Sequence, residues 1–269
     1  KANGADKRPG HLPKVLVFDI ETSPILARVW GIWQQNIGLN MIKEDWFVLS
    51  YAAKWLGVGD SVDDVMYQDL RGKIDDTEKG YRDSELLGGI WNLLNEADVV
   101  ITQNGKKFDV KKLNARFVIN GYQPTSGFKH IDTLQIAKRI FAFTSNKLEY
   151  MTDKLCVKFK KLKHGDFPGF ELWQQCLADN PKAWEEMEEY NKHDVLSLEE
   201  LYMKLSAWDD KHPNFNLYTE DDERVCRCGC SKFTLNGYAY TAVSKFQKYR
   251  CSECGAETRG RTNLFTKEK

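Results

Sequence analysis

Four acidic residues, at three separate places in the chain, are of types that could bind metal together. Asp19 and Glu21 lie two positions apart at the end of a short apolar run. Asp109 follows a polar loop, and Asp194 falls inside a long helical pattern. Carboxylate oxygens are ligands that Mg²⁺ and Mn²⁺ prefer. Such a set would suit phosphodiester hydrolysis, in which divalent ions activate water and stabilise the leaving oxygen.

Asp19 and Glu21 close the apolar run 14–20, which has the pattern of a buried strand. Side chains alternate along a strand, so both carboxylates would point to the same face. Two like charges side by side repel each other unless a cation lies between them. The pair alone is weak evidence, because the ends of strands often carry solvated acids.

Asp109 lies near the start of a helical pattern, where a carboxylate is electrostatically favoured in any case. Helix capping is therefore an alternative to metal binding at this position. The neighbouring Gly105 would let the backbone turn sharply or approach a ligand.

Asp194 is the most informative of the acids, because it interrupts an apolar stripe on the helical pattern 181–207. The stripe consists of Met187, Tyr190, Asp194, Leu198, Leu201 and Leu205. Steps of three and four residues place these side chains on one helical face. Burying an unpaired carboxylate costs several kcal/mol unless it is paired or ligates metal. A neutral, hydrogen-bonding Asp is the alternative.

The elements that must position these acids predict an α/β domain with a mixed sheet. Strands are expected at 14–20, 46–56, 62–67, 98–103 and 128–131. Helices are expected after Ser84 as N-cap, at 107–120 with Gly121 closing it, at 133–143, and at 181–207 with Pro181 in the first turn. Strands first and then alternation with helices indicate a three-strand meander followed by parallel additions.

Three motifs carry a resemblance to a known family. They are DIET at 19–22, NGKKFD at 104–109 and YNKHD at 190–194. In this order they resemble the exonuclease motifs of the DEDD superfamily of 3′–5′ exonucleases, which has a ribonuclease H-like fold. Tyr190, four residues before Asp194, resembles the tyrosine branch (DEDDy), which includes the exonuclease domains of family-B polymerases. The histidine branch would need His at position 189, which is Glu. The resemblance covers roughly residues 14–206.

The resemblance implies two Mg²⁺ or Mn²⁺ ions. Asp19, Glu21 and Asp194 would hold the ion that activates water. Asp19 would also hold the second ion, with Asp109 acting through water. Tyr190 would orient the attacking water, because a phenol with a pKa near ~10 is a poor base at neutral pH.

Substrate contacts are expected around the first two motifs. Thr22, Asn104 and Phe108 resemble substrate-side positions, although Phe108 could equally be a core residue. Two basic stretches could follow a phosphate backbone or be solvated faces: Lys106, Lys107, Lys111, Lys112 and Arg116, and Lys154, Lys158, Lys160, Lys161 and Lys163. Trp30, Trp33 and Trp46 could stack on unpaired bases or lie in the core. Of these basic residues, Lys107 and Lys111 are the two that we expect to bind substrate.

Five of the seven cysteines crowd into the last fifth of the chain. Cys226 and Cys228, with Cys251 and Cys254, resemble the two knuckles of a zinc ribbon joined by a hairpin, with four thiolates around one structural Zn²⁺. Cys230 is the substitute ligand, since the first knuckle is CxC and not CxxC. A redox-active pair is the alternative.

The chain length and the distribution of charge indicate the domain organisation of the protein and the kind of partner it binds. We expect a flexible leader at 1–13, a ribonuclease H-like domain at 14–210, a linker at 211–223 and the zinc ribbon at 224–269. The net charge is +0, but ten Lys/Arg against three Glu from Arg224 onward give the ribbon a balance of +7. Interleaved aromatics make this module suited to nucleic acid, with structural docking as the alternative. No apolar run is long enough for a membrane span.

The resemblance to the DEDD exonucleases implies a two-metal 3′–5′ exonuclease that acts on DNA, single-stranded at its 3′ end, with the ribbon assisting. Related alternatives are an exoribonuclease and a non-catalytic nucleic-acid-binding protein on a nuclease fold. A polymerase or repair machine is a conceivable partner. The cysteine usage favours a reducing, cytoplasmic location, or the host cytoplasm if the source is viral.

Overall fold

A computed structural model describes residues 13–74, 82–160, 162, 165–218 and 224–265. A five-stranded mixed sheet has the order β5-β4-β1-β6-β7. Its strands are β1 (Val15–Thr22), β4 (Val48–Trp55), β5 (Met66–Asp69), β6 (Val99–Thr102) and β7 (Lys129–Asp132). β1, β4 and β5 pair antiparallel, whereas β6 and β7 add in parallel. This confirms the expected fold class, a meander of strands with parallel additions.

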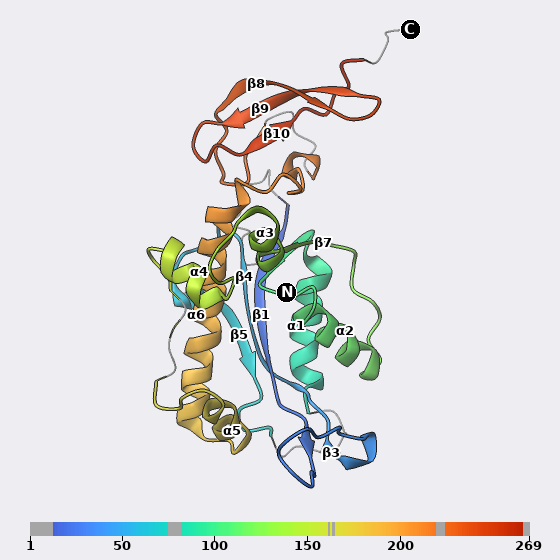
Figure 1. The fold of residues 1–269 in the computed structure, drawn as a ribbon, viewed down its shortest axis with the longest axis vertical. Helices are drawn as coiled ribbons and strands as arrows, with labels where there is room; N and C mark the ends of the chain where they lie inside the picture. The colour runs from blue at the N-terminus through green and yellow to red at the C-terminus, as the bar shows by residue number, and fades with distance from the viewer. Residues whose placement is uncertain (1–12, 75–81, 161, 163–164, 219–223, 266–269) are drawn as a thin grey trace, which may run out of the picture.

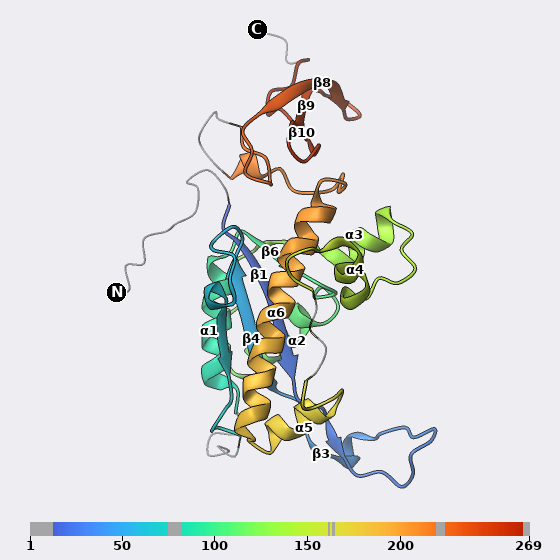
Figure 2. The ribbon, with the colours of Figure 1, turned by 90° about the vertical axis from the view of Figure 1, so that its left-hand side faces the viewer.

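Helices cover both faces of this sheet (Figures 1 and 2). On one face lie α1 (Ser84–Glu96) and α2 (Asp109–Ile119). On the other lie α3 (Thr133–Ile140), α4 (Leu148–Leu155) and the long α6 (Pro181–Ser206), with α5 (Glu171–Leu177) beside the start of α6. Because side chains alternate along β1, Leu16 and Phe18 pack with α1, and Val15 and Val17 pack with the second half of α6.

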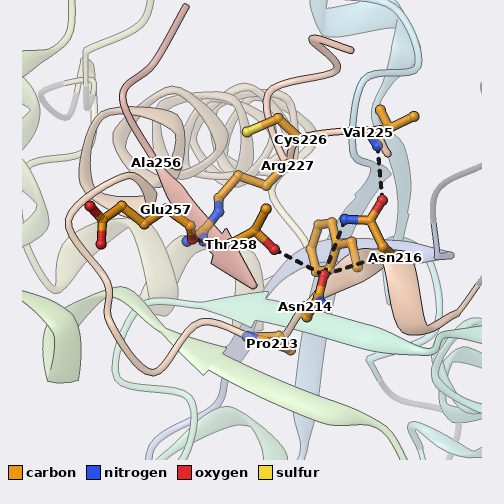
Figure 3. A pocket seen from close by; sticks show the side chains of 10 residues that line it. Pro213, Asn214, Asn216, Val225, Cys226, Arg227, Ala256, Glu257 and Thr258 are labelled. Atoms are coloured by element: carbon orange, nitrogen blue, oxygen red, sulfur yellow. Dashed lines mark hydrogen bonds between the residues drawn. The ribbon is translucent and has the colours of Figure 1, made fainter. Parts of the chain in front are cut away.

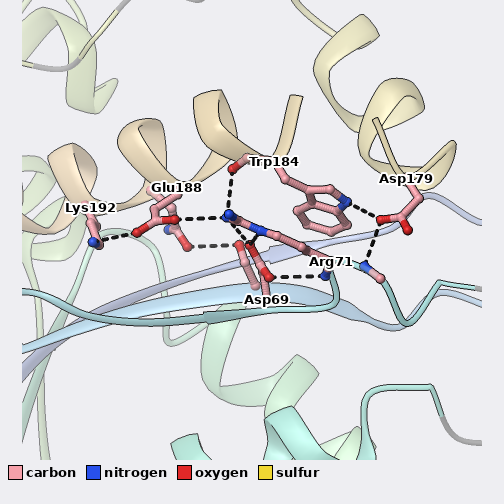
Figure 4. Close-up of polar contacts among 9 residues, drawn as sticks. Asp69, Arg71, Asp179, Trp184, Glu188 and Lys192 are labelled. Carbon is pink, nitrogen blue, oxygen red and sulfur yellow. Dashed lines mark hydrogen bonds and ion pairs between the residues drawn. The ribbon is translucent and has the colours of Figure 1, made fainter. Parts of the chain in front are cut away.

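The long helix α6 is fastened to the edge of the sheet by Arg71, just after β5 (Figure 4). Arg71 Nη2 donates to Asp69 Oδ2 at 2.8 Å, to Glu188 Oε2 at 2.9 Å and to the Trp184 carbonyl at 3.4 Å. Lys192 pairs with Glu188 at 2.7 Å from the next turn. Pro181 occupies the first turn of α6, as expected, with Asn180 as its N-cap.

Several predicted boundaries are wrong in detail. The segment expected as a strand from 62 begins as a short 3₁₀ helix, η2 (Val62–Asp64), before β5. Ser84 is the first residue of α1 and not its cap, since Asp83 holds the cap position. α2 begins at Asp109, two residues later than expected. Its end agrees with the expectation, because Gly121 follows the C-cap Asn120 with the left-handed φ of +77° that closes a helix.

The segment between β1 and β4 does not belong to the main sheet. β2 (Leu26–Ala27), a 3₁₀ turn η1 (Leu39–Met41) and β3 (Ile42–Glu44) form a separate two-stranded sheet with its own loop. Trp30 and Trp33 in this loop are 97% and 81% exposed. They are therefore not core residues, which was one of the two interpretations of these tryptophans.

A three-stranded sheet follows the C-terminal end of α6 (Figures 1 and 2). It consists of β8 (Phe233–Tyr240), β9 (Lys245–Cys251) and β10 (Glu257–Arg259), all antiparallel. The expected hairpin between the two cysteine pairs is thus present as β8 and β9. Among the described helices, none has the length and apolar character needed to cross a membrane.

The segment between α6 and this small sheet packs against both. It contains a 3₁₀ helix, η3 (Phe215–Leu217), whose Phe215 is buried. Asn216 Oδ1 accepts the Val225 N–H at 2.8 Å, and Thr258 Oγ1 donates to Asn214 Oδ1 at 3.3 Å (Figure 3). Arg227 Nη1 donates to the Ser206 carbonyl at 2.6 Å and so binds the last turn of α6. Part of the expected linker therefore has fixed contacts, while residues 219–223 and the leader 1–12 lie outside the described residues.

Candidate metal and nucleic-acid site

Three of the four expected carboxylates come together where β1 faces the middle of α6. Ligand oxygens of Asp19, Glu21 and Asp194 all lie within 4.8 Å of one another. Asp19 and Glu21 reach this point by strand alternation, and Asp194 is buried on the sheet-facing side of α6. Three carboxylates this close repel one another without a cation, so the donor set fits a hard divalent ion.

Asp19 is held by a residue that the sequence did not single out. Asn191 Nδ2 donates to Asp19 Oδ2 at 2.8 Å, and Asn191 Oδ1 accepts from Ser50 Oγ at 3.0 Å. Both Asn191 and Ser50 are completely buried. The one available signal was the spacing: Asn191 lies three residues before Asp194, which places it on the same side of α6. Ser50, on β4, had no local signal.

Asp109 stands slightly apart from the other three carboxylates. It is the first residue of α2 and is buried, and its Oδ1 accepts the Ile20 N–H at 3.3 Å. This contact places it against the backbone between Asp19 and Glu21. Burial raises the pKa of Asp109 to about 7, against the lowering effect of backbone hydrogen bonds. A nearby cation would restore its charge, which agrees with an outer role at a metal site.

Tyr190 lies one helical turn before Asp194 and is nearly buried. Its ring meets Trp173 of α5 edge to face, with centroids 6.2 Å apart. The ring position is thus set by packing between α5 and α6.

The loop of the second motif is shaped by Asp132 at the end of β7. Asp132 carboxylate oxygens accept the Asn104 N–H at 3.0 Å and the Lys106 N–H at 3.2 Å, and they also cap α3. Asn104 adopts a left-handed φ of +66°. A Cβ at Gly105 would approach Thr102 Oγ1 to 2.3 Å, so only glycine fits there. Asp132 therefore has a structural role, since it holds both the loop of the second motif and the start of α3.

The residues expected to contact substrate differ in their position and exposure. Thr22 ends β1 at an irregularity in its pairing with β4. Phe108 is 38% exposed and so is not a core residue. Lys107 and Lys111 are exposed on the loop and on α2. Their contact with substrate stays a prediction.

Arg116 was expected as one of the basic residues that could follow a phosphate backbone, and the structure contradicts this expectation. It is buried and forms a bidentate ion pair with Asp83, with Nε–Oδ2 at 2.8 Å and Nη2–Oδ1 at 2.6 Å. Asp83 Oδ2 also accepts the Val48 N–H at 2.9 Å. Arg116 therefore joins α2 to the start of α1 and of β4, and its guanidinium is already neutralised.

The second basic stretch is largely paired on the surface. Lys154 and Lys160 each lie 3.3 Å from an Asp153 oxygen, and Lys158 pairs with Asp60. Lys161 and Lys163 lie outside the described residues. The solvated-face interpretation suits this stretch better than a phosphate track.

The four cysteines favoured as zinc ligands form a second donor cluster. The Sγ atoms of Cys226, Cys228, Cys251 and Cys254 lie within 4.8 Å of one another. Cys230 is outside this group, and its Sγ accepts the Lys232 N–H at 3.2 Å. Burial would raise the pKa of Cys251, but N–H groups of Cys254 and Glu253 lower it to about 7. Four sulfurs at this separation suit a tetrahedral metal ion.

Cations and aromatic rings alternate on the small sheet that follows. Arg224 lies 3.5 Å from the Tyr249 ring centroid, Lys245 lies 3.8 Å from that of Tyr238 and Arg259 lies 4.6 Å from that of Phe246. Such pairs offer both charge and ring faces to a strand of nucleic acid.

Comparison with known proteins identifies the family. A family model described as RNase_H superfamily matches residues 56–206, more than half of the 269 residues. The chain therefore belongs to the RNase H superfamily. The matched range begins after Asp19 and Glu21. In the fold, these two carboxylates lie within 4.8 Å of Asp194, which is inside the matched range. No curated protein matches the sequence.

Among solved structures, the chain is similar to the family B DNA polymerase from the hyperthermophilic archaeon Pyrobaculum calidifontis. The TM-score is 0.51 at 17% sequence identity, and the match covers 73% of this chain and 25% of the polymerase. At this identity the likeness concerns the fold, which agrees with the ribonuclease H-like expectation. The chain spans only about a quarter of the polymerase's length.

Proposed function

We propose that this protein is a two-metal 3′–5′ exonuclease that shortens DNA, single-stranded at its 3′ end. The observation that carries the proposal is the meeting of Asp19, Glu21 and Asp194 within 4.8 Å on an RNase H superfamily fold. Tyr190 beside Asp194 on α6 supports the tyrosine branch of the DEDD exonucleases.

In this proposal the carboxylates hold Mg²⁺ or Mn²⁺. When bound, the ions supply the activated water and neutralise charge on the phosphate. Asp19, Glu21 and Asp194 bind directly, while Asp109 acts through water from the start of α2. Asn191 keeps the Asp19 carboxylate in place. Tyr190 positions the attacking water, since a phenol is a poor base at neutral pH.

The cysteine cluster would hold one structural Zn²⁺ through Cys226, Cys228, Cys251 and Cys254, and the ribbon would assist nucleic-acid binding. Its charge balance of +7 and its cation–ring pairs support this role. A polymerase or repair machine as partner, and a cytoplasmic location, belong to the same proposal.

A direct assay tests the reaction. The purified protein is incubated with 5′-labelled single-stranded DNA, or with RNA of the same sequence, in the presence of Mn²⁺. A ladder shortened from the 3′ end on DNA is the expected result. Asp194→Asn should abolish the ladder, whereas Asp153→Asn, on the exposed end of α4, should leave it unchanged. Digestion of RNA alone would make the protein an exoribonuclease, and digestion of neither would favour a non-catalytic binder.

A further inference from the structure

Lys112, on α2, lies between two aromatic rings from different parts of the chain. Its Nζ is 3.8 Å from the ring centroid of Trp46 and 5.2 Å from that of Phe108. Trp46 comes just before β4, and Phe108 holds the N-cap position of α2. Trp46 is partly buried and Phe108 is 38% exposed, so their rings still reach the surface. We call Trp46, Phe108 and Lys112 the aromatic shelf.

The charge of Lys112 is poorly compensated by the protein. The side chain is partly buried, and no ion pair joins it to a carboxylate among the described residues. Burial lowers the pKa of Lys112, and the charge of Asp45 only partly opposes this effect. A partly desolvated cation gains most from an anion that supplies the missing charge. Lys112 thus differs from Lys154, Lys158 and Lys160, which are paired with aspartates.

The aromatic shelf adjoins the carboxylate site through the backbone. Phe108 precedes Asp109, whose Oδ1 accepts the Ile20 N–H. Trp46 lies two residues before Val48, the partner of Thr22 at the end of β1. A hollow of about 330 Å³ continues from the shelf. It is lined by Lys43, Glu44, Asp45, Trp46, Phe47, Arg82 and Arg116.

We propose that the aromatic shelf binds the unpaired nucleotides that precede the 3′-terminal one. A base stacks on Trp46, and the adjoining phosphate pairs with the Lys112 ammonium. This inference rests on the proposed exonuclease function and adds Trp46 and Lys112 to the expected contact of Phe108. An aromatic face can stack only on a base whose own face is accessible, so the shelf favours a single strand over the end of a duplex.

Two substrates separate the shelf from the chemistry. The first is a 5′-labelled single-stranded DNA of about 20 nucleotides, which is longer than the ~4–16 nucleotides that one single-strand-binding module covers. The second is the p-nitrophenyl ester of thymidine 5′-monophosphate, in which nitrophenol replaces every preceding nucleotide. Both are cleaved at the carboxylate site, but only the first reaches the shelf.

The test variants are Trp46→Phe, Trp46→Ala, Lys112→Met and Lys112→Arg. Lys112→Met keeps the apolar stem and removes the charge, so lost packing does not explain its effect. Lys138→Met, an exposed lysine on α3 without a described ion pair, is the matched control. Melting temperatures identify any variant that fails to fold. If Trp46→Ala fails to fold, the two Lys112 variants still decide the question.

We expect Lys112→Met and Trp46→Ala to raise the KM for the oligonucleotide about 5- to 150-fold, the range for losing one stacking contact of about 1–3 kcal/mol. Lys112→Arg and Trp46→Phe should recover most of the affinity, and Lys138→Met should match the wild type. Activity on the nitrophenyl ester should not change in any variant. A folded Lys112→Met protein with wild-type KM for the oligonucleotide would overturn the shelf, and so would a folded Trp46→Ala protein with wild-type KM. A wild-type protein that cleaves neither substrate would instead refute the proposed function.

Discussion

Removing the amide of Asn191 should weaken metal binding without changing any metal ligand. In Asn191→Leu, Asp19 Oδ2 loses the donor at 2.8 Å, and Ser50 Oγ loses its acceptor at 3.0 Å. A hydrogen bond to a charged group contributes about 1.5–3 kcal/mol. At about 1.4 kcal/mol per factor of ten, this corresponds to roughly a 10- to 100-fold effect.

The assay is the Mn²⁺ dependence of DNA shortening. We expect the Mn²⁺ concentration for half-maximal activity to rise about 10- to 100-fold in Asn191→Leu, in line with the loss of groups that orient metal ligands. Ser50→Ala should give a smaller shift in the same direction, because Asn191 still reaches Asp19 but is less constrained. High Mn²⁺ should restore most of the rate in both variants.

Ser206→Ala is the matched control for Ser50→Ala, since Ser206 is a buried serine near the far end of α6. Its Mn²⁺ dependence should equal that of the wild type. Thermal melting of each variant separates lost metal affinity from lost folding. A folded Asn191→Leu protein whose Mn²⁺ dependence is unchanged would show that Asn191 does not position Asp19.

Three further outcomes follow from the structure. Arg116→Met leaves the fully buried Asp83 unpaired, so the free energy of unfolding should fall by about 3–5 kcal/mol and the melting temperature by roughly 10 °C. Cys251→Ser, or zinc chelation, should unfold the small sheet while the five-stranded sheet stays folded, as near-UV circular dichroism and limited proteolysis would report. Without Mg²⁺ or Mn²⁺, the pKa of Asp109 at about 7 lies above the ~3.9 of an unfolded Asp, so the folded state holds an extra proton between them. The protonated Asp109 carboxyl therefore contributes its full stabilisation below about pH 4. This stabilisation is lost as the pH rises to 7, and the free energy of unfolding falls by at most about 1.4 kcal/mol per pH unit.

Each of these outcomes has its own control. The double variant Arg116→Met with Asp83→Leu should recover part of the stability, because no charge is then left buried alone. Cys230→Ser should leave the zinc content and the small sheet intact, since Cys230 is outside the four-sulfur cluster. The stability difference between wild type and Asp109→Asn should depend on pH in this way, because the contributions of the other groups cancel in the comparison. Parallel stability curves for wild type and Asp109→Asn would contradict the raised pKa.

Features that repeat at short range were predictable from the sequence. The alternation in β1 placed Asp19 and Glu21 on one face, and the stripe along α6 placed Asp194 toward the sheet. These depend on periods of two and 3.6 residues, which the backbone geometry of each element imposes locally. The spacing of the cysteine pairs similarly predicted the four-sulfur cluster, because each knuckle is a few residues long.

Local rules did not predict where the strand expected from residue 62 would begin. Asp64 Oδ2 accepts the Ser61 N–H at 2.9 Å and the Ser61 hydroxyl at 2.8 Å, which closes a short 3₁₀ turn in place of extended chain. Side chains that bond to their own neighbouring backbone compete with strand pairing in this way. The β-branched pattern around residue 62 concealed that competition.

Long-range pairing accounts for the rest of the site. Asn191 meets Asp19 across 172 positions of the chain, and Ser50 meets Asn191 across 141. Arg116 looked like a free cation in its local run, but Asp83, brought beside it by the packing of α1 on α2, neutralises it. Lys112 has no ion pair among the described residues, because the fold places the rings of Trp46 and Phe108 beside its ammonium group. Residue types and periods thus selected the carboxylates, whereas the partners that hold or neutralise each side chain came from elements that meet only in the folded chain.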